Sequence, residues 1–240
     1  MHYNNFLVRK KIKGKDIYIK EFEDKSKLVM TGVDFNFRKY NLKNTNKFLR
    51  EHRLTDKKIA KTYQKHTKNV VAFPHPGEFY GVDGFVTDEN PVMVVTADCI
   101  PILIKGNNSA ALVHSGWRGV KKRIYFEAIN QMHEHKSAFK IYMLPSIGKN
   151  SFQVSEDFVE EFDGRDRFNR FKTPDKEKGK YLFDLKSFVK SELIDFGIKS
   201  ENIFIENVDT FTDKRFHSYR REKSEYGLNA IIYIPASIEE

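Results

Sequence analysis

The chain has 240 residues, with 42 Lys plus Arg against 33 Asp plus Glu and a formal net charge of +9 at pH 7. Hydrophobic residues make up 40% of it, which is enough for a buried core and excludes a disordered chain. The apolar runs are as short as strands, and none reaches the ~20 residues that a membrane-spanning helix needs. We therefore expect a single globular domain over residues 1–240 that does not contact a membrane.

The positive charge is compatible with binding of nucleic acid or of small anions such as phosphate. However, the lysines are spread along the whole sequence, and no helix-turn-helix, zinc-finger or RNP-like pattern accompanies them. We therefore favour solvated surface charge over a nucleic-acid partner. A single cysteine and an amino terminus without an apolar core indicate a reducing compartment, the cytoplasm.

Strand-like and helical patterns are interleaved without a strict strand–helix–strand rhythm, which predicts an α+β fold. The clearest helix is expected over residues 184–196, because Asp184 caps it and Gly197 ends it. The other expected elements are, in chain order, one or two strands in 6–29, a helix in 41–52, a strand in 58–73, a loop at 73–77, a turn at 81–84 that leads into a strand at 85–87, strands at 92–95, 100–104 and 110–113, a helix at 117–133, a strand at 140–144, a helix at 154–162, a surface excursion at 163–180, and strands at 203–206 and 230–234.

The only cysteine, Cys99, lies fifteen positions before His114, with strand-like runs on both sides and a turn signal between them. A lone thiol cannot form an internal disulfide, so it either packs as a small hydrophobic side chain or takes part in chemistry. A two-residue turn at Gly106-Asn107 would place Cys99 directly opposite His114, with Cβ atoms roughly 4.5–5.5 Å apart. A turn centred one residue later would place His114 two positions away. In the first register the thiolate and the imidazole could share a metal ion.

Catalytic zinc typically has three protein ligands and one open position, so a third donor is needed besides Cys99 and His114. His66 is the first candidate, because it follows Gln64 and precedes a strand-like run. His75, in a loop between two prolines, is the second. The remaining histidines carry no comparable signal.

Charged residues near these positions suggest further roles. Arg118, which follows Trp117, and the pair Arg220-Arg221 are candidates for bidentate binding of an oxyanion, and aromatic residues flank the pair. Asp98, beside the thiol, is either a general base, a group that orients a ligand histidine, or the acceptor of a hydrogen bond within a turn.

These motifs resemble those of the laccase-domain family, whose members are also described as multicopper polyphenol oxidase-like or purine nucleoside phosphorylase-like proteins. Their order is that of the family, and they cover about residues 60–230. The most specific are Thr-Ala-Asp-Cys and His-Ser-Gly-Trp-Arg-Gly. The matching segments are Gln64-Lys65-His66, Asp83 with Val86-Thr87, Thr96-Ala97-Asp98-Cys99-Ile100-Pro101, His114-Ser115-Gly116-Trp117-Arg118-Gly119, Ile147-Gly148, Phe152-Gln153-Val154 and Ser218-Tyr219-Arg220-Arg221.

The resemblance implies a four-layer αββα sandwich of mixed β-sheets flanked by helices, with a zinc site made by His66, Cys99 and His114. It also implies phosphorolysis of adenosine, inosine, guanosine or methylthioadenosine, and zinc-assisted deamination of adenosine. Copper-dependent oxidation of polyphenols is an older assignment of the family, and some members are linked to editing of peptidoglycan precursors.

The chain departs from the family pattern at several positions. Cysteines that the family often has near Ser146 or Asn150, and at Phe211, are absent. Too few soft ligands then remain for a multicopper cluster, which weakens the oxidase alternative and leaves copper as the second choice of metal after zinc.

We therefore expect a purine nucleoside phosphorylase with attendant adenosine deaminase activity, which binds purine nucleosides, phosphate and zinc. Oligomeric state is left open. In deamination Asp98 would carry the proton, in phosphorolysis the arginines would hold phosphate, and Trp117 could stack on the base. The expected catalytic residues are His66, Cys99, His114 and Asp98, and the expected substrate-binding residues are Gln64, Trp117, Arg118, Arg220 and Arg221.

Two alternatives belong to other classes. In one, Cys99 is a nucleophile paired with His114, in a cysteine hydrolase or amidase that acts on peptidoglycan precursors. In the other, the chain is a non-catalytic basic module that binds nucleic acid, with affinity that falls steeply with salt.

Overall fold

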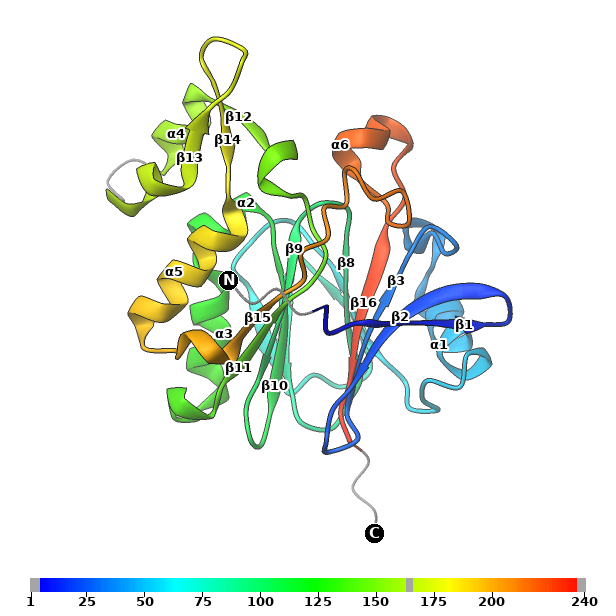
Figure 1. Cartoon of the computed structure of the whole chain (residues 1–240). Helices are drawn as coiled ribbons and strands as arrows, with labels where there is room; N and C mark the ends of the chain where they lie inside the picture. Colours follow the sequence, from blue (N-terminus) through cyan, green and yellow to red (C-terminus); the bar gives the residue numbers. More distant parts are fainter. Residues whose placement is uncertain (1–4, 163–165, 237–240) are drawn as a thin grey trace.

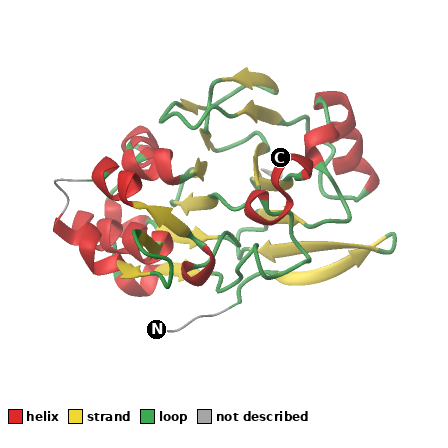
Figure 2. Cartoon of the chain, turned by 90° about the horizontal axis from the view of Figure 1, so that it is seen from above, coloured by secondary structure: helices red, strands yellow, loops and turns green. Residues whose placement is uncertain are grey.

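The structure is a computed structural model that describes residues 5–162 and 166–236 (Figure 1). Their strands form a seven-stranded sheet, a six-stranded sheet and a small three-stranded sheet. Helices lie on two opposite sides of the strands, as Figure 2 shows.

The seven-stranded sheet is mostly antiparallel. Only β4 runs parallel to its neighbours, β8 and β6. The strands are, in spatial order, β1 (Val8–Ile12), β2 (Lys15–Glu21), β3 (Lys27–Thr31), β16 (Asn229–Ile234), β8 (Val92–Thr96), β4 (Ala60–Tyr63) and β6 (Gly77–Tyr80).

The six-stranded sheet is antiparallel in its centre and has a parallel pair at each edge. Its strands are, in spatial order, β15 (Ile203–Ile205), β11 (Lys140–Met143), β9 (Ile100–Lys105), β10 (Ala110–Ser115), β7 (Gly84–Thr87) and β5 (Val70–Ala72). The small antiparallel sheet contains β12 (Gln153–Ser155), β14 (Lys180–Phe183) and β13 (Lys172–Pro174). The helices are α1 (Leu42–Glu51), α2 (Trp117–Lys121), α3 (Ile124–Met132), α4 (Glu156–Glu161), α5 (Leu185–Phe196) and α6 (Tyr219–Glu222).

Three hydrophobic clusters separate these elements into layers, because successive side chains of a strand point to opposite faces. In β10, Leu112 belongs to the cluster between the two large sheets, whereas Val113 belongs to the cluster beneath α3 and α5. On the other outer face, Phe48 of α1 shares a cluster with Ile232 of β16. The order of layers is therefore helix, sheet, sheet, helix, which confirms the α+β class and the expected αββα sandwich.

The chain passes three times from the seven-stranded sheet to the six-stranded sheet, and we call each of these connections a crossing. The strands β4, β6 and β8 lie in the seven-stranded sheet, and the strands that follow them, β5, β7 and β9, lie in the six-stranded sheet. The crossings are joined, because the N–H of Asp83 in the second donates to the carbonyl of Asn69 in the first, at 2.9 Å. The carbonyl of Asp83 in turn accepts from the N–H of His114, at 2.8 Å. Residues of the first and third crossings line one cavity.

The register of the β9–β10 hairpin differs from the first of the two that we considered. His114 pairs with Pro101, and Ala110 pairs with Lys105, so the turn is centred one residue later than Gly106-Asn107. The second of the two registers is therefore the one that forms, so Cys99 does not lie directly opposite His114, which is two positions away. Cys99 immediately precedes Ile100, the first paired residue of β9, so it is a diagonal neighbour of His114 across the hairpin.

Most other expected elements are present, with a few differences. The helix expected at 117–133 is divided into α2 and α3 by Arg123, whose backbone is left-handed with φ 56°. Residues 6–29 contribute to three strands, and Gly77 opens a strand, β6, that the sequence did not indicate. The surface excursion expected at 163–180 contains β13, while residues 163–165 lie outside the described residues.

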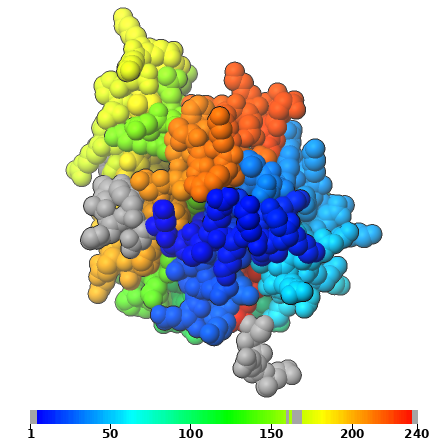
Figure 3. All heavy atoms as spheres, turned by 45° about the vertical axis from the view of Figure 1, so that its right-hand side comes forward, coloured from blue at the N-terminus to red at the C-terminus, as the bar shows by residue number. Residues whose placement is uncertain are grey.

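The amino-terminal segment is fastened to the rest of the chain at one edge. The N–H of Leu7 donates to a carboxylate oxygen of Glu206 at 2.7 Å, and Figure 3 shows this blue segment lying against the orange one that contains Glu206. Among the described residues, no helix has the length and hydropathy required to cross a bilayer.

We predict that Asp184→Ala lowers the free energy of unfolding by about 1 kcal/mol, the usual effect of losing an N-cap. The Asp184 side chain accepts from the N–H and the hydroxyl of Ser187, at 3.0 and 2.8 Å, at the start of α5. Urea unfolding followed by circular dichroism measures the change. Asp184→Asn keeps the cap and should cost less. Equal losses in the two variants would contradict the capping role.

Candidate active site

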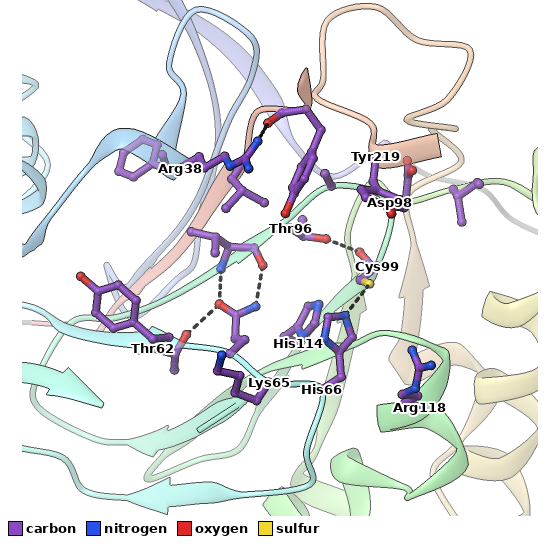
Figure 4. A pocket seen from close by; sticks show the side chains of 18 of the residues that line it. Arg38, Thr62, Lys65, His66, Thr96, Asp98, Cys99, His114, Arg118 and Tyr219 are labelled. Atoms are coloured by element: carbon purple, nitrogen blue, oxygen red, sulfur yellow. Dashed lines mark hydrogen bonds between the residues drawn. The ribbon is translucent and has the colours of Figure 1, made fainter. Parts of the chain in front are cut away.

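Three side chains that are distant in the sequence converge at the crossings between the sheets. His66 follows β4, Cys99 lies between β8 and β9, and His114 lies in β10, and one ligand atom from each is within 4.8 Å of the others. The sulfur of Cys99 is 3.8 Å from Nε2 of His66 (Figure 4). Zinc ligands at 2.0–2.3 Å in a tetrahedron are about 3.3–3.8 Å apart. The distance between the sulfur and His66 is within this range, so two imidazoles and a thiolate could hold a metal ion here and leave one coordination position open.

A buried carboxylate, Asp83, holds two of these donors in place. Its Oδ1 accepts from Nδ1 of His114 at 2.9 Å and from the N–H of His66 at 3.0 Å. Its Oδ2 accepts from the N–H groups of Lys65 and Thr67, at 3.2 and 2.8 Å, and from the Thr67 hydroxyl at 2.7 Å. Because Nδ1 of His114 donates to the carboxylate, Nε2 is left free to bind a metal ion.

The opposite charges of Asp83, Cys99 and His114 stabilise one another, as the pKa values of these groups show. Burial raises the pKa of Asp83, but hydrogen bonds from His114 and Thr67 outweigh it and lower the pKa to about 2. Burial also raises the pKa of the Cys99 thiol, and the neighbouring His114 and His66 lower it to about 6. Burial lowers the pKa of His114, while Cys99 and Asp83 raise it to about 9. The negative charges that keep a proton on His114 likewise favour a cation among the three donors.

Gly116 lets the donors approach closely. A Cβ atom at this position would lie 2.8 Å from the sulfur of Cys99 and 3.0 Å from Cδ2 of His66. Its φ of −65° is open to any residue, so the lack of space alone requires glycine here.

The three donors line a cavity of about 810 Å³, large enough for a small organic ligand. Figure 4 shows Arg118 on one side of the donors, and Thr62 and Arg38 on the other. Most of the larger side chains in the wall are aromatic or basic. They are Phe37, Tyr40, Tyr63, Tyr80, Trp117, Phe152, Tyr219 and Tyr226, and Arg38, Lys61, Lys65, Arg118 and Arg220.

Two predicted substrate-binding residues open α2 beside the donors. The guanidinium of Arg118 lies 4.2 Å from the centroid of the Trp117 ring, and both residues line the cavity. Trp117 packs edge-on against Phe158, with ring centroids 5.2 Å apart. The ring is therefore fixed, while Arg118 is exposed and available to a ligand.

The two neighbouring arginines of α6 have different surroundings. Arg220 lines the cavity, and its guanidinium donates to the carbonyl of Gln153 at 3.1 Å. Arg221 is not part of the cavity lining. Its guanidinium donates to three carbonyls and to Glu222, so the geometry does not support the prediction that Arg221 binds substrate. The carbonyls are those of Thr210, Phe211 and Phe216.

Asp98 joins the segment that carries Cys99 to the carboxyl-terminal loop. Its carboxylate accepts from the hydroxyls of Thr210 and Ser218, at 2.6 and 3.0 Å, and from the N–H of Arg220 at 2.7 Å. Of the three roles considered for Asp98, the hydrogen-bonding one is therefore what the geometry gives. The carboxylate that orients a ligand histidine is Asp83, not Asp98.

Gln64 lines the cavity, but the protein already engages both ends of its amide. It accepts from the N–H of Val95 at 2.9 Å and donates to the Val95 carbonyl at 2.6 Å, which continues the pairing of β4 with β8. A direct contact of Gln64 with substrate stays a prediction. His75, the alternative third ligand, is exposed and lies outside the group of donors.

A sequence model of the family described as "Multi-copper polyphenol oxidoreductase laccase" matches residues 38–234. The chain belongs to this family. Curated relatives in it are named purine nucleoside phosphorylase. The one from Haemophilus influenzae is 32% identical over 177 residues, which are 71% of this chain and 72% of the relative. The one from Aquifex aeolicus is 31% identical over 191 residues, 75% of this chain and 85% of the relative.

Solved structures share the fold of this family member. The Bacillus licheniformis hypothetical protein YfiH superposes with a TM-score of 0.80 at 14% identity, over 97% of this chain and all of that one. A Neisseria meningitidis protein superposes with a TM-score of 0.77 at 19% identity, over 96% of this chain and all of that one. At these identities the likeness concerns the fold alone.

We predict that Asp83→Asn lowers zinc affinity by about 10- to 100-fold, because ligand-orienting groups have effects of this size. A chelating dye in competition with the protein measures the affinity. The variant should also be less stable. Since the folded pKa of Asp83, about 2, is below its ordinary 3.8, the carboxylate stabilises the fold above about pH 4 and loses this effect as pH falls through about 2.

The stability difference between wild type and Asp83→Asn should accordingly be constant above pH 4 and shrink below it. Asp88→Asn, at an exposed aspartate just after β7, is the matched control and should change neither property. Wild-type zinc affinity in Asp83→Asn would contradict the orienting role.

We further predict that Gly116→Ala weakens zinc binding without unfolding the protein, because the new methyl group displaces the sulfur of Cys99 or the ring of His66. Metal content after dialysis measures the effect. Gly77→Ala is the control, since a Cβ there meets its nearest atoms at 3.7 Å, an ordinary contact distance. If both variants retain one zinc per chain, the close packing at Gly116 is not needed for the site.

Proposed function

We propose that the protein is a metal-assisted purine nucleoside phosphorylase. The observation that carries this proposal is the convergence of His66, Cys99 and His114 in the wall of a cavity with aromatic and basic side chains. The names of the relatives support the same reaction.

We propose zinc as the metal, held by these three side chains. When bound, zinc would supply a Lewis acid with one open position. Among the described residues, His66, Cys99 and His114 are the one group of three such donors. Laccase chemistry uses several copper centres, so this donor supply favours zinc over copper and phosphorolysis over oxidation. A reducing cytoplasm is part of the proposal, because Cys99 must remain a thiolate to act as a ligand.

In phosphorolysis the residues of the chain have separate tasks. Arg118 and Arg220 would hold phosphate beside the donors, since both line the cavity and are exposed. A phosphate oxygen attacks C1′ of the ribose, the bond between C1′ and N9 breaks, and its electron pair stays on the purine. Trp117 and the tyrosines of the wall offer flat surfaces on which the base can stack.

Adenosine deamination is proposed as an attendant activity, on the strength of the donor set and its open position alone. A proton carrier is needed as well. Asp98 is the carboxylate that the sequence suggests for this role, but it already accepts three hydrogen bonds and therefore fits a positioning role better. This is why phosphorolysis is proposed as the main reaction.

A cysteine hydrolase that acts on peptidoglycan precursors is the second candidate, favoured by the lowered pKa of Cys99 and its contact with His66. Metal content separates the two candidates. One zinc per chain that is lost in Cys99→Ala supports the metal site, whereas rapid alkylation of zinc-free native protein by iodoacetamide supports the nucleophile.

The test of the main proposal is incubation of purified, zinc-loaded protein with adenosine or inosine, with and without phosphate, followed by chromatography. We expect free adenine or hypoxanthine only when phosphate is present, and inosine from adenosine in either case if deamination occurs. His66→Ala should abolish product, while His75→Ala, which changes an exposed histidine outside the cavity, should not. No product from wild type under any condition would refute the proposal.

A further inference from the structure

The cavity contains a buried cation to which the proposed reaction assigns no role. Lys61 of β4 is 3% exposed and lines the cavity. Its ammonium donates to the carbonyl of Tyr40, lies 4.7 Å from the centroid of the Tyr63 ring and is 3.5 Å from the Tyr63 hydroxyl. In the part of the chain that is described, no ion pair links Lys61 to a carboxylate.

Neutral groups stabilise this charge only in part, because the Tyr40 carbonyl and the Tyr63 hydroxyl accept from it and leave one N–H of the ammonium for a ligand. Glu78 is a carboxylate whose charge acts on Lys61, and it accepts a hydrogen bond from the Tyr63 hydroxyl at 2.7 Å rather than from the ammonium. Burial lowers the pKa of Lys61, and the charge of Glu78 only partly opposes this effect. A buried ammonium is stabilised by acceptors or negative charge from whatever enters the cavity.

The side chains around Lys61 suit a flat ring. Two stacked aromatic pairs adjoin it and line the same cavity: Tyr63 with Tyr80, 4.6 Å apart with an angle of 5°, and Phe37 with Tyr40, 4.3 Å apart with an angle of 23°. Nucleic-acid bases stack on aromatic side chains with a gain of about 1–3 kcal/mol per base. This part of the wall therefore offers a purine aromatic surface beside a cation.

The distance along β4 also suits a nucleoside. Lys61 precedes Gln64 by three residues, about 10 Å along a strand, and the loop with His66 follows. Thr62, the next residue after Lys61, lies on the opposite side of the metal donors from Arg118 (Figure 4). A nucleoside whose ribose is near the donors and the phosphate-binding arginines can thus extend its base toward Lys61.

We propose that Lys61 donates a hydrogen bond to N7 and O6 of the purine, and that it makes the protein selective for 6-oxopurine nucleosides, inosine and guanosine, over adenosine. The proposal rests on the proposed phosphorolysis. A 6-oxopurine presents two acceptors on this edge, whereas adenine presents the N7 acceptor beside an amino donor that an ammonium disfavours.

The same contact assists the reaction. As the bond between C1′ and N9 breaks, the electron pair moves onto the purine, and negative charge grows on N7 and O6. A fixed ammonium beside these atoms interacts more strongly with the leaving purine than with the intact nucleoside, which lowers the barrier. The released base then takes its proton from water, and Lys61 keeps its own.

The experiment compares Lys61→Met with wild type, using inosine and adenosine at saturating phosphate. We expect wild type to prefer inosine, and the variant to lose about tenfold or more in kcat/KM for inosine, with a smaller loss for adenosine, because a hydrogen-bonding site discriminates through the group that it contacts. Lys61→Arg keeps the charge and should retain part of the preference. Lys43→Met, at an exposed lysine on α1 outside the cavity lining, should match wild type.

Calorimetric binding of hypoxanthine and adenine provides a readout that does not depend on turnover. If Lys61→Met binds hypoxanthine tenfold more weakly and adenine almost as well as wild type does, the role of Lys61 is supported. This holds even if no nucleoside is cleaved. Absence of cleavage would refute only the phosphorylase function. Equal losses of affinity for hypoxanthine and adenine in Lys61→Met would overturn the role of Lys61 in selectivity. An unchanged ratio of kcat/KM for inosine to kcat/KM for adenosine would also overturn it. Should Lys61→Met fail to fold, Lys61→Gln is judged by the same ratios.

Discussion

The site depends on one buried carboxylate. Asp83 accepts hydrogen bonds from the backbone of the loop that carries His66 and from the ring of His114, so a single side chain sets the distance between two of the candidate metal donors. Four of its five hydrogen bonds come from the three consecutive residues 65–67. Because the loop has no strand partners at this point, the negative charge takes the place of a β-ladder in fixing its course.

The topology explains why the donors gather here. Each of the segments with His66, Asp83 and Cys99 follows a strand of the seven-stranded sheet and precedes a strand of the six-stranded sheet. A crossing between packed sheets must take place at an end of the sandwich, and the hydrogen bonds of Asp83 hold neighbouring crossings together. Polar side chains can collect at this end, whereas residues further along the same strands are enclosed in the core between the sheets.

Patterns among neighbouring residues are sufficient to predict the layers of the fold, but they are not sufficient to predict the geometry of the site. Alternation along β10 and the cap and stop signals of α5 depend on neighbours in the sequence, so these elements could be predicted. The hairpin register depends on which of two similar turns forms, and the sequence leaves both open. The partners of Asp83, and the different surroundings of Arg220 and Arg221, come from residues far away in the chain. The burial of Lys61 also depends on distant residues, and nothing in the sequence distinguishes Lys61 from the many exposed lysines.

Two residues at the site have a left-handed backbone, His66 with φ 56° and Asp98 with φ 86°. For residues other than glycine this conformation costs roughly 1–2 kcal/mol each. Each is held by hydrogen bonds to a carboxylate, that of Asp83 for His66 and its own for Asp98, and such bonds to a charged group contribute about 1.5–3 kcal/mol. The gain is at least comparable with the strain at His66, which has one such bond, and exceeds it at Asp98, which has three. The metal donors therefore stay in place because charged hydrogen bonds oppose the local preference of the backbone, and the two carboxylates that do so lie beside the donors rather than among them.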